Sequence, residues 1–138
     1  MKINNVKTLA KKGEELAALY LKSLGCNILS SNFKGSRGEI DLVALYQTEL
    51  IVAEVKTRSK HDYKTAENSI TKSKKKNLTY TAMEFLQKHQ QYSKCSVRFD
   101  LIVVFYFPDD ETYSIKHYKD AFKPEFSQDS DNYQRLIF

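Results

Sequence analysis

The sequence predicts a single α/β domain in which helices flank a β-sheet. Three observations support this fold class: an N-terminal segment with helical periodicity, several short apolar segments typical of strands, and a second helical segment between them. The expected order is helix, three strands, helix, two strands. With 138 residues, of which 41% are hydrophobic and 28% charged, the chain is long enough to bury a core.

The first helix is predicted over residues 6–24, because its apolar residues recur at spacings of three and four and so share one face. Gly25 follows where a helix typically ends. Glu15 falls opposite the apolar stripe and is expected to be exposed, whereas Glu14 falls at the edge of the stripe. A first strand is expected over residues 26–33, and a flexible, positively charged loop over residues 34–38.

Two further strands are predicted over residues 39–46 and 50–57, joined by a polar turn. A second helix should follow from about residue 66 to residue 89. Lys74 lies within its apolar stripe and is therefore expected to point inward.

Towards the end of the segment 96–107, both the odd and the even positions are apolar, which is typical of a strand buried on both faces. A short edge strand over residues 112–117 is expected to pair back against it. Arg98 and Asp100 share a parity on the longer strand and are expected to form an ion pair with each other.

The charge distribution favours a nucleic-acid partner over a membrane. The formal net charge is +5 and the isoelectric point is near 9.1, while residues 108–138 hold seven acidic and four basic residues. A basic body with an acidic tail fits nucleic-acid binding; the alternative is a soluble protein with an ordinary basic bias. The longest uninterrupted apolar run, residues 101–107, is too short to span a bilayer, so a cytoplasmic protein is expected.

Two cysteines, Cys26 and Cys95, lie far apart in the chain and form no paired motif. A reducing cytoplasm favours free thiols, although the spacing alone does not distinguish these from a disulfide.

The candidate site lies between Gly38 and Arg58, where charged residues interrupt apolar strands. These are Glu39, Asp41, Glu54 and Lys56. Burying unpaired charge is costly, so something should compensate it, and a divalent metal with a phosphate substrate would do so.

Asp41 and Glu54 can lie side by side across a hairpin, where opposed Cβ atoms are ~5 Å apart. Mg²⁺ prefers oxygen ligands of this kind, and the carbonyl of Val55 offers another. Lys56 projects from the same face as Glu54 and could orient water or stabilise a transition state. The alternative is an ion-pair ladder on one strand face without chemistry.

In this context, residues 39–56 resemble the PD-(D/E)xK motif of restriction-endonuclease-like nucleases, with Asp41 as the first acid and Glu54-Val55-Lys56 as ExK. More closely, the chain is identified as a member of the YraN family of small bacterial proteins. The resemblance covers roughly residues 8–122 and rests on Gly13-Glu14, Ala17, Gly25, Asn32, the GEIDLVA and EVKTR segments, Lys74, Arg98-Phe99-Asp100 and Ala121-Phe122. We therefore expect a nuclease-like domain over residues 1–122. An acidic tail over 123–138 would then be disordered or would dock on a partner.

The resemblance implies a restriction-endonuclease-like mixed sheet flanked by helices, with the site on an edge hairpin, similar to archaeal Holliday-junction resolvases. Glu14 matches a helix-borne glutamate that often completes the metal site of such folds, and Lys74 matches a basic residue on the helix after the core. Lys34 stands where the family usually has arginine, which is the better bidentate partner for phosphate.

The leading hypothesis is an endonuclease that depends on Mg²⁺ (or Mn²⁺) and acts on structured or branched DNA. Similar resolvases are dimers, which favours a homodimer. The alternatives are a non-catalytic nucleic-acid-binding module with the same fold, or a subunit that recruits a protein partner. The residues assigned to the nuclease are Asp41, Glu54, Lys56 and Glu39 for catalysis, Asp41, Glu54, Val55 and Glu14 for metal, and Lys34, Arg37, Arg58 and Lys74 for nucleic acid.

Overall fold

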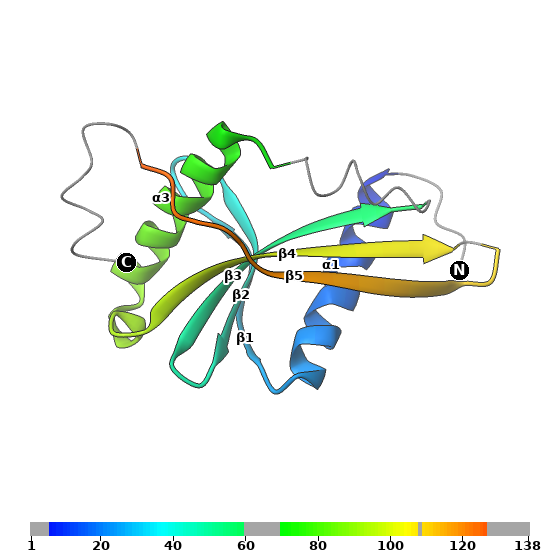
Figure 1. The fold of residues 1–138 in the computed structure, drawn as a ribbon, viewed down its shortest axis with the longest axis horizontal. Helices are drawn as coiled ribbons and strands as arrows, with labels where there is room; N and C mark the ends of the chain where they lie inside the picture. The colour runs from blue at the N-terminus through cyan, green and yellow to red at the C-terminus, as the bar shows by residue number, and fades with distance from the viewer. Residues whose placement is uncertain (1–5, 60–69, 108, 127–138) are drawn as a thin grey trace.

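A computed structural model of the chain describes residues 6–59, 70–107 and 109–126, which form a mixed five-stranded sheet with a helix on each face (Figure 1). The predicted α/β class and element order are confirmed, and the architecture is consistent with a restriction-endonuclease-like fold. The elements are α1 (Val6–Ser23), β1 (Asn27–Lys34), β2 (Glu39–Tyr46), β3 (Glu49–Arg58), α3 (Lys72–Lys88), the 3₁₀ turn η1 (Gln90–Tyr92), β4 (Ser96–Phe107) and β5 (Thr112–Phe122).

The strands lie in the order β1-β2-β3-β4-β5, and every neighbouring pair is antiparallel except β3 and β4. Parallel neighbours require a crossover connection, and α3 belongs to the crossover between β3 and β4. The hairpin of β2 and β3 is therefore interior, and the expectation that it forms an edge is wrong, because β1 pairs along the outer side of β2. The edge strand β5 is longer than predicted and continues to Phe122.

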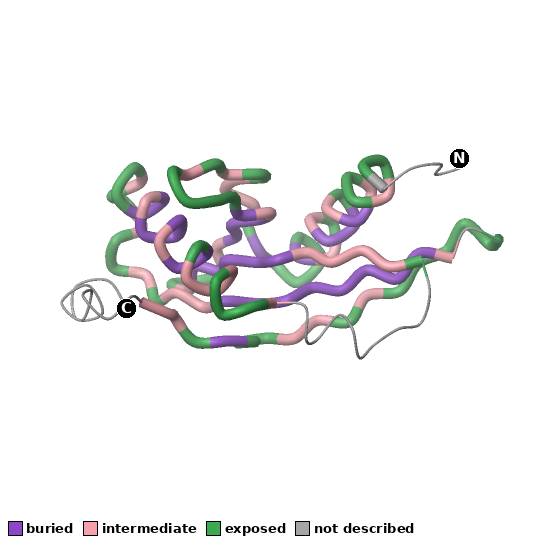
Figure 2. Tube along the Cα trace, turned by 90° about the horizontal axis from the view of Figure 1, so that it is seen from above, coloured by how far each residue is buried: buried purple, intermediate pink, exposed green. Residues whose placement is uncertain are grey.

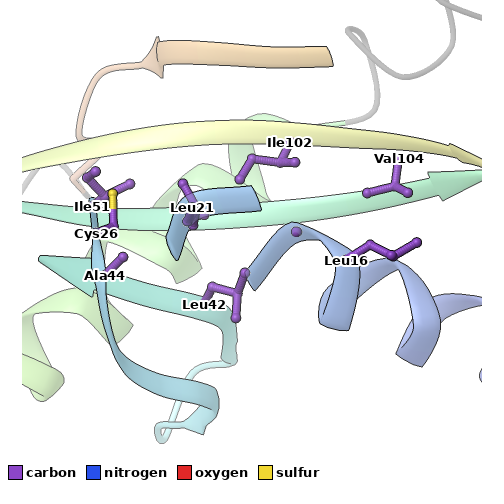
Figure 3. Close-up of a cluster of buried hydrophobic side chains, with 10 residues drawn as sticks. Leu16, Leu21, Cys26, Leu42, Ala44, Ile51, Ile102 and Val104 are labelled. Carbon is purple, nitrogen blue, oxygen red and sulfur yellow. The ribbon is translucent and has the colours of Figure 1, made fainter. Parts of the chain in front are cut away.

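The helix α1 ends where the sequence predicts, because Gly25 adopts φ 93°, which is unfavourable for other residues. The Cys26 N–H donates to the Leu21 carbonyl at 3.1 Å, and the Gly25 N–H donates to the Lys22 carbonyl at 3.0 Å. This pair of bonds is a Schellman motif. Figure 3 shows the apolar face of α1 against the sheet. The residues labelled there are Leu16, Leu21, Cys26, Leu42, Ala44, Ile51, Ile102 and Val104.

The helix α3 covers the opposite face of the sheet, where Leu78, Ala82 and Phe85 pack on strand residues of the other parity. It begins at Lys72 because Thr71 is extended and its hydroxyl accepts a hydrogen bond from the Lys74 N–H at 3.1 Å. The predicted start was therefore too early at residues 70–71, while residues 66–69 lie outside the described ranges.

The core is centred on β3 and β4, where the buried residues run through the middle of the molecule (Figure 2). Phe99 to Tyr106 of β4 are all buried, which confirms the prediction of a strand covered on both faces. Within the described ranges no helix is long and apolar enough to cross a membrane. Cys26 and Cys95 are both free, and residues 127–138 of the predicted tail lie outside the described chain.

A buried charged network joins β4 and β5 on the face covered by α1. Asp100 is fully buried, and Arg98 donates to both of its oxygens, at 2.8 and 2.7 Å, which confirms the predicted pair. His117 Nε2 lies 2.7 Å from Asp100 Oδ2, and the Asp120 N–H donates to Oδ1 at 2.9 Å. Burial alone would raise the pKa of Asp100, but the hydrogen bonds from His117, Arg98 and Asp120 lower it to about 2.

Candidate active site

The candidate site lies where β2 and β3 stop pairing. Their ladder ends at the pair Leu42 and Ala53, although β2 begins at Glu39 and β3 continues to Arg58. Just beyond this pair, Asp41 Oδ2 accepts a hydrogen bond from the Val55 N–H at 2.8 Å. Since the N–H and C=O of one strand residue point to the same edge, the Val55 carbonyl also points towards Asp41. Asp41 therefore occupies the position of a missing strand partner.

Glu54 faces α3 and is 3% exposed. Lys74 of α3 approaches to 2.8 Å, measured from Nζ to Glu54 Oε1, and Lys56 of β3 approaches to 3.4 Å from the same oxygen. The prediction that Lys74 points inward is confirmed. The prediction that Glu54 and Lys56 share a strand face is confirmed as well, because the two side chains are in contact.

Glu14 reaches the site because α1 packs unusually close to β3. A Cβ atom at Gly13 would lie 1.8 Å from Thr57 Oγ1, so only glycine permits this approach. The next residue, Glu14, interacts with the side chains of Asn32 and Asp41, which lower its pKa against the larger effect of burial. Asn32 lies in β1 opposite Asp41 and has a positive φ of 56°, a conformation that asparagine tolerates better than most residues.

The electrostatics of the site are dominated by acidic side chains. Burial and then the charge of Glu54 raise the pKa of Asp41 to about 7. Burial also raises the pKa of Glu14, and the charge of Glu39 adds to that effect. Burial would lower the pKa of Lys74, but its hydrogen bond to Glu54 and the charge of that carboxylate raise it overall. The described residues therefore place more negative than positive charge around Asp41.

A cavity of about 450 Å³ opens beside these residues, between α3 and the start of β2. Glu39 and Asp41 line its acidic side, and Arg37 and Lys74 contribute positive charge. Glu54 is buried and does not line the cavity itself. Lys74 connects the two, because it lines the cavity and pairs with Glu54. The complete lining is Arg37, Gly38, Glu39, Asp41, Thr71, Ser73, Lys74, Asn77 and Leu78.

Comparison with known proteins identifies the family. A family model described as "Uncharacterised protein family UPF0102" matches residues 13–104. The chain belongs to UPF0102, the YraN family. The match begins at Gly13, which allows α1 to approach β3, and extends through all the acidic residues of the site.

Curated UPF0102 proteins are similar over most of their length. The protein of Pelotomaculum thermopropionicum is 38% identical over 117 residues, covering 84% of this chain and 96% of the relative. That of Desulforamulus reducens is 35% identical over 116 residues, covering 83% and 95%. That of Caldanaerobacter subterraneus subsp. tengcongensis is 34% identical over 123 residues, covering 88% and 100%.

In this UPF0102 chain the predicted basic residues do not all meet at the cavity. Arg37 and Lys74 line it. Lys34 is exposed at the end of β1, opposite Glu39, and Arg58 at the end of β3 donates to the Thr57 carbonyl at 2.9 Å. Lys34 and Arg58 therefore flank the site without lining the cavity.

Four cavity residues were not predicted from the sequence: Thr71, Ser73, Asn77 and Leu78. Asn77 follows Lys74 by three residues and so shares its side of α3, a spacing that would have found it once Lys74 was known to point inward. Thr57 was also missed, because the sequence gives no sign of which residue Gly13 meets.

The donor set fits a hard divalent cation in part. Asp41, Glu54, Glu14 and the Val55 carbonyl offer only oxygen, and Mg²⁺ is often held by one or two carboxylates, with waters and substrate phosphates completing its shell. The residues that the structure describes contain no group of three or more His, Cys, Asp or Glu arranged to hold a metal. Glu54 Oε1 is instead paired with two lysines. A two-carboxylate site fits this geometry, whereas a closed cage of protein ligands does not.

Proposed function

We propose that this chain is a metal-dependent endonuclease that acts on DNA, with structured or branched DNA as its substrate class. The observation that supports this most is the cluster of acidic side chains at the point where β2 and β3 separate, with Glu54 buried and Asp41 and Glu14 half-buried, beside a cavity lined by Arg37 and Lys74. A fold core normally excludes such charge, since burying an uncompensated carboxylate is costly. The site would gain compensation from a divalent cation and a phosphate together.

The role proposed for each residue follows from its position in the site. Asp41 and Glu54 would hold the cation, with the Val55 carbonyl and Glu14 as additional oxygen donors. When bound, the cation would supply positive charge for the transferring phosphate and activate water. Lys56 would stabilise negative charge in the transition state, and Glu39, on the cavity wall, would orient the attacking water.

The basic residues would hold the substrate backbone. Arg37 and Lys74 would contact phosphate within the cavity, while Lys34 and Arg58 would contact phosphates on either side of it. Because cutting both strands of a branched substrate requires two sites, we include a homodimer in the proposal, to be checked by light scattering of the purified protein.

A second function is favoured by the ion pairs of Glu54. With Lys74 and Lys56 both on one oxygen, the Glu54 carboxylate is neutralised without metal, as it would be in a module that binds nucleic acid but does not cut it. Such a module would show strongly salt-dependent DNA binding and no cleavage.

The decisive experiment is cleavage of labelled duplex, single-stranded, flap and four-way-junction DNA with Mg²⁺ or Mn²⁺. We expect cutting by the wild-type protein, and its loss in Asp41→Ala, Glu54→Ala and Lys56→Ala variants that keep their circular dichroism. Glu15→Ala, an exposed acid of α1, is the matched control and should cut normally. Salt-dependent binding without cutting in any of these conditions would favour the binding module, and full activity of Glu54→Ala would refute the assigned site.

A further inference from the structure

The loop between β1 and β2 is held against α3, contrary to the flexibility that its glycines suggest. The Gly35 N–H donates to the Gly38 carbonyl at 2.8 Å, which closes the loop on itself. The Ser36 N–H donates to both carboxylate oxygens of Glu84, at 3.1 and 2.9 Å, and the Ser36 hydroxyl donates to Glu84 Oε1. One carboxylate of α3 therefore takes three hydrogen-bond contacts from one residue of the loop.

The chain geometry at Gly35 allows this contact. A Cβ atom there would lie 2.7 Å from Glu84 Oε2 and 3.0 Å from Thr81 Cγ2, so a larger residue would displace the Glu84 carboxylate or the loop. The hydrogen bonds from Ser36 also lower the pKa of Glu84, because they favour its ionised form.

Arg37 follows directly and is oriented by the same helix. Its guanidinium carbon lies 4.2 Å from the centroid of the Tyr80 ring, and the residue lines the cavity together with Asp41 and Lys74. A guanidinium that stacks on an aromatic face keeps its N–H edge available for bidentate contact with phosphate. Over residues 6–59, 70–107 and 109–126, no hydrogen-bond acceptor is paired with that edge of Arg37.

Glu84 has no evident benefit for a nucleic-acid site if it acts by charge alone. A half-buried carboxylate on the helix that lines the cavity repels a polyanion, so its direct effect on DNA affinity is unfavourable. Its hydrogen bonds, in contrast, fix the residue next to Arg37 and so reduce the conformational freedom that Arg37 would lose on binding.

We propose that Glu84 is a positioning residue, which holds Ser36 so that Arg37, stacked on Tyr80, presents its N–H edge to a backbone phosphate of nucleic acid in the cavity. This inference rests on the proposed function, because it assumes that the cavity binds DNA. It assigns to α3 a second role besides supplying Lys74.

The test is DNA affinity without divalent metal, measured by fluorescence anisotropy of a labelled four-way junction in EDTA. We expect Glu84→Ala to weaken binding about three- to tenfold, or about 0.7–1.4 kcal/mol, because Arg37 would then have to be ordered on binding. Weaker binding would distinguish positioning from a simple charge effect, since removing a negative charge would by itself tighten binding. Glu15→Ala, which removes an exposed acid from α1, is the control for charge and should bind as the wild type does or slightly more tightly.

A double-mutant cycle shows whether Glu84 acts through Arg37. Arg37→Ala should weaken binding about tenfold, which corresponds to about 1.4 kcal/mol, because a charge-assisted hydrogen bond to phosphate would be lost. Adding Glu84→Ala to Arg37→Ala should then have no further weakening effect. Amide hydrogen exchange of Ser36, measured without DNA, should accelerate in Glu84→Ala while the amides of β3 and β4 stay protected.

The outcomes separate the two proposals. Unchanged or tighter binding by Glu84→Ala, fully additive losses in the cycle, or unaltered exchange at Ser36 would each overturn the positioning role while leaving cleavage by the wild type as evidence for the nuclease. A wild-type protein that binds none of the DNA substrates would overturn both.

Discussion

Two charged clusters lie beside each other on the central strands, and they are compensated very differently. Asp100 pairs in register with Ala53, the residue before Glu54. On the α1 face, Asp100 receives enough donors to bring its pKa down to about 2, whereas at the other cluster Asp41 has its pKa raised to about 7 by burial and Glu54. Burial is therefore common to both clusters, and the supply of donors separates them.

This difference distinguishes a charged cluster that is complete within the fold from one that is not. The donors around Asp100 come from β4 and β5, including a backbone N–H, so that cluster is complete within the folded chain. The carboxylates around Asp41 share one backbone donor, the Asn32 side chain and two lysines, and their remaining negative charge faces a cavity. An incomplete cluster of this kind is typical of a site that awaits a ligand.

The largest expected effect is the loss of stability in Asp100→Asn. The substitution removes the fully buried carboxylate that pairs with Arg98 and His117, which should lower the free energy of unfolding at pH 7 by about 3–5 kcal/mol. Urea unfolding of both proteins would measure the difference. Asp110→Asn, in the exposed turn before β5, is the matched control and should change stability by less than about 0.5 kcal/mol.

The stability that Asp100 contributes should also depend on pH. The pKa of Asp100 is lower in the folded state than the ordinary value of about 3.9, so its contribution is complete above about pH 4 and disappears as the pH falls towards 2. The difference between wild type and Asp100→Asn should narrow over that window. A difference that stayed constant down to pH 2 would mean that the charge of Asp100 is not what stabilises the cluster.

A moderate effect is expected from Gly13→Ala, which tests whether the acidic cluster depends on the close approach of α1. The new methyl group would overlap Thr57 Oγ1, so we expect a loss of about 1–3 kcal/mol and displacement of Glu14. Thermal unfolding would measure the loss, and the double variant Gly13→Ala with Thr57→Ala should recover part of it. No recovery would indicate that the strain lies elsewhere in the helix.

The smallest expected effect is a gain in stability in Asp41→Asn, opposite in sign to the loss expected in Asp100→Asn. Asp41→Asn keeps an oxygen that can accept from the Val55 N–H but removes a carboxylate from an acid-rich site, so it should raise the free energy of unfolding by about 1 kcal/mol while abolishing cleavage. Urea unfolding of Asp41→Asn and Asp100→Asn would compare the same change, aspartate to asparagine, in the two clusters. Destabilisation by both variants would contradict the contrast and favour a structural ion-pair ladder.

Local patterns account for the parts of this structure that the sequence predicts. The end of α1 at Gly25, the inward direction of Lys74 and the pairing of Arg98 with Asp100 follow from spacing and parity within one element. Each depends on residues that are close in the sequence or on a single amphipathic face.

The features that were missed depend on which elements become neighbours. The resemblance implied a hairpin at an edge, and the sequence pattern could not correct this, because it does not show that β1 pairs with β2. The contact of Gly13 with Thr57 and the attachment of Ser36 to Glu84 join residues more than 40 positions apart. Spacing along the chain carries no information about such pairs, so the loop was wrongly expected to be flexible.

The parallel pairing of β3 with β4 also determines when the site can form during folding. β4 can reach β3 only after the crossover containing α3 has been made, and such non-local pairings form slowly compared with hairpins. The strands that carry Asp41 and Glu54 leave the ribosome before α3 and β4 do. A nascent chain at that stage holds the acidic residues but lacks Lys74 and the strand that buries Glu54. The site is therefore completed together with the centre of the sheet, late in synthesis.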